Sequence, residues 1–419
     1  MRLRRVVVTG LGAITPIGNT VSAFWDNLLR GVSGAGPITL FDASKFKTQF
    51  ACEVKGYQAE AYYDVKELRK YDRHVQFALL ATKEAIGDAA FEEGSIDLDR
   101  AGVIFSTGIG GIMSYERDIA DYLQNPDVPR FNPFFVTRMI ANMAAGHISM
   151  QYSFRGPNFG VVSACASSTH AIGLACDQIR LGRADIMITG GTEAPISTSG
   201  IGGFNSMRAL STRNDEYQTA SRPLSGSRDG FVLGEGAGCL ILEEYEHAVK
   251  RGAHIYAEVA GIGASADAYH MTATHPDGLG ATLVMRNSLK DAELTVDDID
   301  YINIHGTSTP NGDPSEIKAI QKVFGEAAKK LNISSTKSMT GHLMGATGAV
   351  EAIASILSIV NDVVPPTINH KDGDEDPEID YSLNFTFNVP QKRLVRAAMS
   401  NTFGFGGHNA TLIFKKFEG

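Results

Sequence analysis

Short β-branched and aliphatic runs alternate with longer, helix-compatible stretches along the whole chain of 419 residues. The predicted strands are residues 6–9, 102–106, 161–163, 186–189, 238–242, 255–260, 301–304, 333–335, 397–400 and 411–414. The predicted helices between them include residues 24–30, 75–90, 171–181, 281–291 and 349–360. Alternation of this kind predicts an α/β fold in which helices are layered on mostly parallel strands.

The pattern also indicates an internal duplication, in which two halves of the chain have the same order of elements. Residues 163–165 and 335–337 both end a predicted strand and lead into a helix rich in glycine and alanine. Adding 172 to the first numbers places Cys165 on Lys337, His170 on His342 and Gly173 on Gly345. We therefore expect two related halves, residues 1–252 and 253–419. The first half is longer, and we expect its surplus, residues 41–72 and 112–152, to cap the site or form a subunit interface.

Composition narrows the class of protein. Hydrophobic residues make up 43% of the chain and charged residues 20%, which is typical of a large globular protein. The formal net charge of −9 disfavours general binding to nucleic acid or anionic membranes, so an acidic partner would need a local basic patch. The four cysteines form no CxxC pair, which disfavours a structural zinc or a disulfide framework.

The cellular location follows from the same features. Unpaired cysteines suit a reducing cytoplasm. The basic residues 1–5 precede only a short strand and no signal-peptide core. No apolar run reaches the roughly 18 residues that a membrane span needs. We therefore expect a cytoplasmic protein with no membrane contact.

One cysteine stands in an unusual setting. Cys165 lies among small residues, where a predicted strand turns sharply into a predicted helix. Such a turn presents its side chain to a substrate, and the N–H groups at the helix end are expected to lower the pKa of the thiol. A buried structural cysteine is the alternative interpretation from this motif alone.

Two histidine motifs favour the catalytic interpretation of the cysteine. His305 directly ends a predicted strand, at a turn of glycine, hydroxyl residues and proline. His342 follows Lys337 by five residues, in a second strand-end loop, so the lysine can tune the electrostatics of the site. Glu351 lies inside an apolar helix and needs a partner if buried; we interpret it as a structural ion or hydrogen-bond partner.

A loop rich in glycine and phenylalanine, residues 401–409, completes the candidate chemistry. Its glycines free backbone N–H groups to point at an anion, and its phenylalanines can close an apolar channel. An oxyanion hole needs two such donors, which the N–H of Cys165 and one from this loop would supply. His170 and His408 also lie near these motifs, and we interpret both as structural.

Four motifs in this order closely resemble the β-ketoacyl-[acyl-carrier-protein] synthases, the elongating condensing enzymes of bacterial fatty-acid synthesis. They are Ala-Cys-Ala-Ser-Ser (164–168), His-Gly-Thr-Ser-Thr (305–309), Lys-Ser-Met-Thr-Gly-His (337–342) and Asn-Thr-Phe-Gly-Phe-Gly-Gly (401–407). The resemblance runs from residue 6 to residue 414, and residues 206–214 and 229–232 favour the type II enzymes over type I. It implies the thiolase fold: two pseudo-symmetric halves in a five-layered α-β-α-β-α sandwich, usually as a homodimer.

The resemblance also implies roles for single residues. Cys165 would form an acyl-enzyme from an acyl chain on a carrier protein. His305 and His342 would hydrogen-bond the malonyl thioester carbonyl during decarboxylation, with Lys337 supporting their electrostatics. Phe405 matches the gating phenylalanine, whose N–H joins that of Cys165 in the oxyanion hole.

Further positions match the family's binding residues. Thr307 and Thr309 would hold the phosphopantetheine arm that carries the substrates, so no other cofactor is expected. Ile109 and Phe204 would line the acyl pocket. The basic rim that would receive the acidic acyl carrier protein comprises Lys66, Arg69, Lys70 and Arg208. Some members bind a structural monovalent cation at positions matching Asn303, Glu351 and Ser400, and no catalytic metal is expected.

Alternatives to an elongating synthase remain. A specialised polyketide-type ketosynthase would use the same residues. A non-catalytic chain-length-factor-like scaffold is disfavoured by Cys165, and a biosynthetic thiolase by the lack of any cysteine after Cys239. A nucleotide-binding enzyme is disfavoured because residues 10–15 lack the third glycine of the dinucleotide fingerprint.

Overall fold

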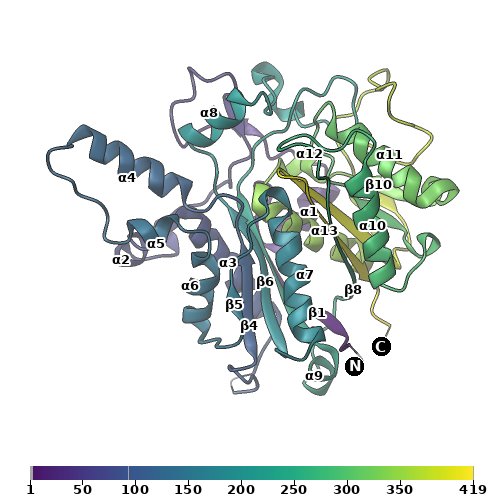
Figure 1. Ribbon diagram of the computed structural model, residues 1–419, viewed down its shortest axis with the longest axis horizontal. Helices are drawn as coiled ribbons and strands as arrows, with labels where there is room; N and C mark the ends of the chain where they lie inside the picture. The colour runs from purple at the N-terminus through teal and green to yellow at the C-terminus, as the bar shows by residue number, and fades with distance from the viewer. Residues whose placement is uncertain (1–2, 93, 419) are drawn as a thin grey trace.

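A ten-stranded sheet runs through the computed structural model, which describes residues 3–92 and 94–418 (Figure 1). The strand order is β10-β9-β13-β14-β8-β1-β7-β6-β4-β5. The bounds are β1 Val6–Ile14, β4 Ala101–Ser106, β5 Asn158–Phe159, β6 Ile186–Glu193, β7 Gly236–Glu244, β8 Ala257–Ala266, β9 Tyr301–Asn303, β10 Asn332–Ser334, β13 Ala397–Gly404 and β14 His408–Lys415. Four short strands, β2 Gly36–Pro37, β3 Phe50–Ala51, β11 Val363–Val364 and β12 Gln391–Lys392, form two separate ribbons.

The large sheet is two five-stranded sheets with the same internal order. The first half runs β5-β4-β6-β7-β1 and the second β10-β9-β13-β14-β8. The strands of the two sheets pair with each other at one place, where Val7 and Val8 of β1 face Glu258 and Ala257 of β8. The duplication expected from the sequence is therefore present in the strand order. Residues 252 and 253 lie in the connection between α9 (Tyr245–Lys250) and β8.

The expectation of mostly parallel strands is wrong. Only four of the nine pairings in the large sheet are parallel: β4 with β5, β4 with β6, β9 with β10 and β9 with β13. The other five are antiparallel. The reason is local at β13 and β14, since a tight turn joins them as a hairpin, and a tight turn can connect only antiparallel strands.

Helices form three layers around the two sheets. In the middle lie α7 (Ser167–Arg180) and α13 (Thr347–Asn361), each of which contacts strands of both halves. Outside the first sheet lie α3 (Arg73–Asp88) and α6 (Met143–Tyr152), and outside the second lie α10 (Leu279–Asp291) and α11 (Gly312–Phe324). This arrangement is the predicted five-layered sandwich. The remaining helices are α1 Val21–Leu29, α2 Val65–Leu68, α4 Ile112–Gln124, α5 Phe135–Met139, α8 Thr198–Ser206 and α12 Lys337–Thr340.

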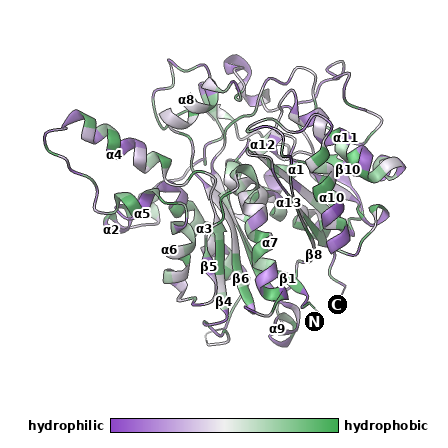
Figure 2. Cartoon of the chain, viewed as in Figure 1, coloured by the Kyte–Doolittle hydropathy of each residue, from purple (hydrophilic) through white to green (hydrophobic). Residues whose placement is uncertain are grey.

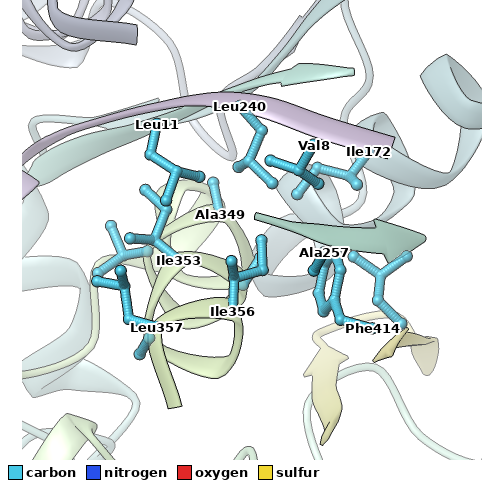
Figure 3. Close-up of a cluster of buried hydrophobic side chains, with 14 of the residues drawn as sticks. Val8, Leu11, Ile172, Leu240, Ala257, Ala349, Ile353, Ile356, Leu357 and Phe414 are labelled. Carbon is cyan, nitrogen blue, oxygen red and sulfur yellow. The ribbon is translucent and has the colours of Figure 1, made fainter. Parts of the chain in front are cut away.

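The central layer is also the centre of the hydrophobic core. Figure 3 shows Ile353, Ile356 and Leu357 of α13 facing side chains from β1 and the neighbouring strands. Burying apolar side chains from both sheets against one helix layer holds the halves together, since the strands joining them share so few pairs. Residues Met344–Asn361 are long and apolar enough to span a membrane by length and composition, contrary to our sequence reading, and 89% of this segment is buried inside the protein.

The repeat is present, but the number that relates residues of the first half to those of the second differs from the predicted 172. A 3-10 turn, η2 (Ala164–Ala166), leads into α7, and a second, η6 (Met344–Ala346), leads into α13. Ala164 and Met344 take the same left-handed conformation, with φ of 51° and 47°. The offset is therefore 180, and the counterpart of Cys165 is Gly345 rather than Lys337. The short helix α12, which precedes η6 and carries Lys337, misled the sequence comparison.

Two further expectations need correction. Residues 161–163 form no strand, because β5 is the edge of the sheet and ends at Phe159. Of the surplus segment 112–152, only α4 and α5 project from the body (Figure 1), whereas α6 packs on α3 and β4 as a regular layer helix. Neither surplus segment lines the catalytic cavity described next.

Candidate active site

A cavity of about 580 Å³ opens where the two halves meet. Cys165, His305 and His342 all line it, together with Phe403, Gly404 and Phe405 of the β13–β14 hairpin. The cysteine comes from the first half, and the histidines and the hairpin come from the second. The structure thus brings together residues that the sequence places up to 240 positions apart.

Backbone geometry presents the cysteine. Ala164 adopts a left-handed conformation, which turns the chain sharply into η2 and then α7. Cys165 is 3% exposed, and its Sγ lies 3.0 Å from Nε2 of His342. The thiol therefore stands near the N-terminal end of a 14-residue helix, whose dipole favours negative charge there.

The expected lowering of the thiol pKa is wrong for the resting protein. Burial, and to a smaller extent the charge of Glu193, raise the pKa of Cys165 to about 12, although the positive charge of Lys337 and the N–H groups of Phe405 and Cys165 act in the opposite direction. Desolvation penalises the thiolate more than these groups stabilise it. At neutral pH the resting site thus holds a thiol, which must lose its proton as it reacts.

The two histidines are fixed by different partners. His342 Nδ1 lies 3.0 Å from Oγ1 of Thr347, and its ring packs edge-on against Phe231 at 5.3 Å. His305 lies two residues after the end of β9, and its backbone N–H donates to Glu316 at 2.9 Å. The two imidazoles are nearly perpendicular, at 86°, with centroids 5.4 Å apart.

Electrostatics keep both histidines neutral. Burial lowers the pKa of His305 and of His342 well below the usual value, and the positive charge of Lys337 lowers both further. Lys337 is 1% exposed and donates to Glu351 Oε1 at 2.5 Å, which supplies the partner that Glu351 was expected to need. Burial raises the pKa of Glu351 to about 7, against the opposing effect of Lys337.

The Gly/Phe hairpin closes over the nucleophile. A Cβ on Gly404 would lie 2.6 Å from the carbonyl of Ser163 and 3.2 Å from the amide nitrogen of Cys165, so only glycine fits this contact. The close approach brings the N–H of Phe405 to the thiol, beside the N–H of Cys165. Two backbone donors therefore lie near the thiol, as an oxyanion hole requires.

The other predicted residues are more dispersed. Thr307 and Thr309 line the cavity, with hydroxyl oxygens 3.1 Å apart, and Arg208 lies exposed at its rim. Ile109 and Phe204 do not line it: Phe204 packs behind Phe231 at 5.4 Å, and Ile109 is 38% exposed. Their assignment to an acyl pocket stays a prediction. Lys66, Arg69 and Lys70 are exposed on and just after α2.

The predicted cation position has suitable donors. Asn303 Oδ1, Ser400 Oγ and Glu351 Oε2 are buried without a hydrogen-bond partner among the described residues. Asn303 and Ser400 are direct register partners on β9 and β13. Oxygen donors of this kind suit a hard cation, and the monovalent cation stays a prediction. Within residues 3–92 and 94–418, no group of three His, Cys, Asp or Glu side chains could hold another metal.

Two buried carboxylates escaped the sequence analysis. Glu316 lines the cavity and accepts the backbone N–H groups of His305 and Gly306, both at 2.9 Å. Glu193 accepts several N–H groups beside the nucleophile and is fully buried. Neither carboxylate stood out in the sequence, because Glu316 lies in the polar stretch 311–318 and Glu193 in the glycine-rich stretch 190–194.

A thiolase-type fold with a buried cysteine, two histidines and an oxyanion hole defines a condensing acyltransferase, which handles acyl groups as thioesters. Residues 3–248 match the family model "Beta-ketoacyl synthase, N-terminal domain" and residues 256–371 match "Beta-ketoacyl synthase, C-terminal domain". The chain belongs to the β-ketoacyl synthase family.

Individual relatives are similar to this chain over nearly its full length. The chain is 49% identical to "3-oxoacyl-[acyl-carrier-protein] synthase 2" of Coxiella burnetii and to that of Staphylococcus aureus, over 99% of this chain and of each relative. A structure described as a type II PKS acyl-carrier protein in complex with its ketosynthase is 34% identical, with a TM-score of 0.90 over 99% of this chain and 100% of that chain. A β-ketoacyl synthase from Burkholderia phymatum is 33% identical, with a TM-score of 0.89 over 99% and 100%.

Proposed function

We infer that this protein condenses an acyl thioester with malonyl-acyl-carrier protein in fatty-acid chain elongation, releasing carbon dioxide and 3-oxoacyl-acyl-carrier protein. The observation that carries this inference is the placement of Cys165 Sγ 3.0 Å from His342, with His305 beside both in one cavity. Incubation with acyl carrier and malonyl carrier should give carbon dioxide and 3-oxoacyl carrier in equal amounts. Product without carbon dioxide, or neither, would contradict it.

In the first step the Cys165 sulfur attacks the acyl thioester. Its proton passes to Nε2 of His342, which is neutral and within hydrogen-bond distance. The carbonyl oxygen takes on negative charge in the position faced by the N–H groups of Cys165 and Phe405. When the carbon–sulfur bond to the carrier breaks, the carrier's thiol leaves with that proton, and an acyl-enzyme remains.

In the second step malonyl carrier loses carbon dioxide. The electron pair of the broken carbon–carbon bond moves into an enolate, whose thioester oxygen accepts hydrogen bonds from the N–H groups of His305 and His342, the latter in the tautomer that carries its proton on Nε2. The carbanion then attacks the acyl carbon and displaces the Cys165 sulfur as a thiolate, which takes a proton from solvent. Donors aimed at the developing enolate lower the barrier because they bind the transition state more strongly than the ground state.

The charge of Lys337 should set the pH at which the acylation rate falls on the acidic side of its pH profile, here called the acid limb. In the wild type, burial and Lys337 hold the pKa of His342 well below 6.5, so acylation should stay level from pH 8 to about pH 6. Lys337→Met removes one depressing charge, which raises the pKa of His342 and moves the acid limb to higher pH. Glu351→Gln, which keeps the lysine, should not raise the limb. An unchanged limb in Lys337→Met, measured by stopped acylation assays across pH, would contradict this account.

We propose that the substrates arrive on the phosphopantetheine arm of an acyl carrier protein, held by Thr307 and Thr309, with no other cofactor. The exposed cations Lys66, Arg69, Lys70 and Arg208 would receive the acidic carrier, as the complex of a related ketosynthase with its carrier supports. Ile109 and Phe204 would contact the acyl chain.

Charge reversal tests the carrier surface. Arg208→Glu combined with Lys66→Glu should raise KM for acyl carrier about tenfold, because complementary charge mainly steers and orients the encounter. Turnover of a small pantetheine thioester should not change. Lys250→Glu is the matched control, because α9 lies at the other end of the molecule from α8 (Figure 1). Equal KM values for all three proteins would exclude this surface.

We also propose a homodimer. Apolar side chains of the projecting α4–α5 segment are exposed, among them Leu123 at 67% and Val136 at 58%. Figure 2 shows hydrophobic residues on α4 although it stands away from the core. Large exposed apolar patches are typical of protein interfaces. A single monomer peak in sedimentation velocity at micromolar concentration would contradict the dimer.

Identity favours fatty-acid elongation over a specialised polyketide pathway. The 3-oxoacyl-[acyl-carrier-protein] synthase 2 relatives are 49% identical to this chain, whereas a type II PKS ketosynthase of known structure is 34% identical. A chain-length-factor-like scaffold is disfavoured because the nucleophile and both histidines are present in one cavity.

A further inference from the structure

The duplicated halves allow a residue-by-residue comparison of the two strands that end at the site. Strand β6 ends at Glu193 and β13 ends at Gly404, and both have eight residues. Each half also has one β-bulge, where β1 pairs with β7 and where β8 pairs with β14, and Ile241 of β7 and Ile413 of β14 directly precede these bulges. Ile241 pairs with Ile188 and Ile413 with Met399, so the register independently places Glu193 on Gly404. Ala194 is then the counterpart of Phe405.

The second half therefore contains a counterpart of the oxyanion hole. The N–H of Gly345 corresponds to that of Cys165, because η6 repeats η2. In the catalytic hole this position is Gly404, whose lack of a side chain lets the hairpin approach Ser163 and Cys165 closely. In its counterpart the position is Glu193, whose side-chain Oε2 accepts the N–H of Gly345 at 2.9 Å.

The same carboxylate joins two turns beside the nucleophile. Oε2 of Glu193 also accepts the N–H of Gly108 at 2.6 Å, and Oε1 accepts from Thr107 Oγ1 at 2.6 Å and Ile109 N–H at 3.2 Å. Residues 107–109 belong to the first half, and Gly345 belongs to the second. A Cβ on Gly345 would lie 2.2 Å from the nitrogen of Gly108, so the two turns touch at the point that the carboxylate holds.

One of these turns forms a wall of the catalytic cavity. Met344, adjacent to Gly345, lines the cavity and packs in the same apolar cluster as Cys165. Met344 also follows His342 by only two residues. Releasing Gly345 would therefore free the turn that places both the cavity wall and the second histidine.

We propose that Glu193 is a positioning residue whose carboxylate acts as a built-in anion, filling the pseudo-symmetric counterpart of the oxyanion hole and holding the 107–109 and 344–345 turns against the nucleophile. This inference rests on the proposed function, since the turn it holds shapes the acylation site. Glu193 touches no substrate in this role; it acts through Gly345 and Met344.

Replacing the anion tests the proposal. Glu193→Ala removes a CH₂–COO⁻ group, which is the size of acetate, and leaves its buried N–H donors unpaired. Acylation of Cys165 by acyl carrier should fall at least about tenfold, because each unpaired buried donor is costly. Acetate and formate should restore the rate saturably and raise the Tm of the variant, whereas butyrate, which is too large, should not.

Two further proteins make the test decisive. Glu84→Ala is the matched control, because Glu84 also accepts two backbone N–H groups, of Ala13 and Val21 at 2.8 Å, but lies outside the cavity; acetate should not restore any acylation it loses. Glu193→Gln fills the space but replaces one oxygen, which accepts two hydrogen bonds, with an NH₂ group that can accept none, so it should acylate more slowly than wild type and not respond to acetate.

The outcomes separate this inference from the proposed function. If wild-type protein forms no acyl-enzyme, the proposed function fails. If the wild type acylates and Glu193→Ala neither slows nor responds to acetate in rate or Tm, the positioning role is wrong. Wild-type acylation by Glu193→Gln would show that the charge is not needed and would also overturn the proposal.

Discussion

Cys165→Ala should abolish acyl-enzyme formation and lower condensation by about three orders of magnitude or more, because no other group can form the thioester. Intact-protein mass spectrometry after incubation with acyl carrier should show one acyl adduct on the wild type and none on the variant. The variant should remain folded, since the change removes one sulfur atom from a site that opens into a cavity. It should also still bind malonyl carrier, because the histidines remain.

Cys176→Ala is the matched control for the nucleophile. Cys176 lies in the same helix, α7, and burial raises its thiol pKa to about 12, as it does for Cys165. Only Cys165 has His342 within 3.0 Å and two backbone donors directed at its sulfur. Cys176→Ala should therefore keep the adduct. An adduct that persists in Cys165→Ala would place the nucleophile elsewhere and end the proposed mechanism.

His305→Ala and His342→Ala should each lower malonyl decarboxylation by about two to three orders of magnitude, since each removes one donor to the enolate oxygen. Both variants should still form acyl-enzyme at least in part, His342→Ala more slowly because it also loses the nearby proton acceptor. Release of labelled carbon dioxide from malonyl carrier measures decarboxylation separately from acylation.

His370→Ala is the control for the histidine pair. His370 also has a pKa lowered by burial, but it stacks on Phe387 at 3.9 Å and does not line the cavity. Its removal should leave decarboxylation within about twofold of wild type, as expected for a change outside the site. Normal decarboxylation in His305→Ala or His342→Ala would remove that histidine from its proposed role.

Much of the fold could be predicted from the sequence because the chemically reactive residues lie close to the ends of strands. His305 lies two residues after β9, and the Gly/Phe motif spans the end of β13 and the turn into β14, so both motifs marked an element as well as the site. Strand direction was not accessible, since a β-rich run looks alike in parallel and antiparallel pairs. The true repeat offset also escaped, because Ala164 and Met344 share a backbone conformation and no side-chain chemistry.

The electrostatics of the site were even less accessible. The cysteine motif correctly indicated helix-end donors but gave no measure of burial, which dominates the thiol pKa. The contacts of Glu316 and Glu193 join residues far apart in sequence, so no local pattern could reveal them. Ile109 and Phe204 show the limit of matching positions, because only packing reveals whether a side chain reaches a cavity.

The two halves have the same strand order but supply different residues to the active site. The first half carries the cysteine at its helix turn, which in the proposed mechanism holds the acyl chain. The second half has glycine at that place and supplies both histidines, the lysine and the closing hairpin. Neither copy is a smaller version of the enzyme. Each half supplies only part of the site, so neither half could carry out the proposed reaction without the other.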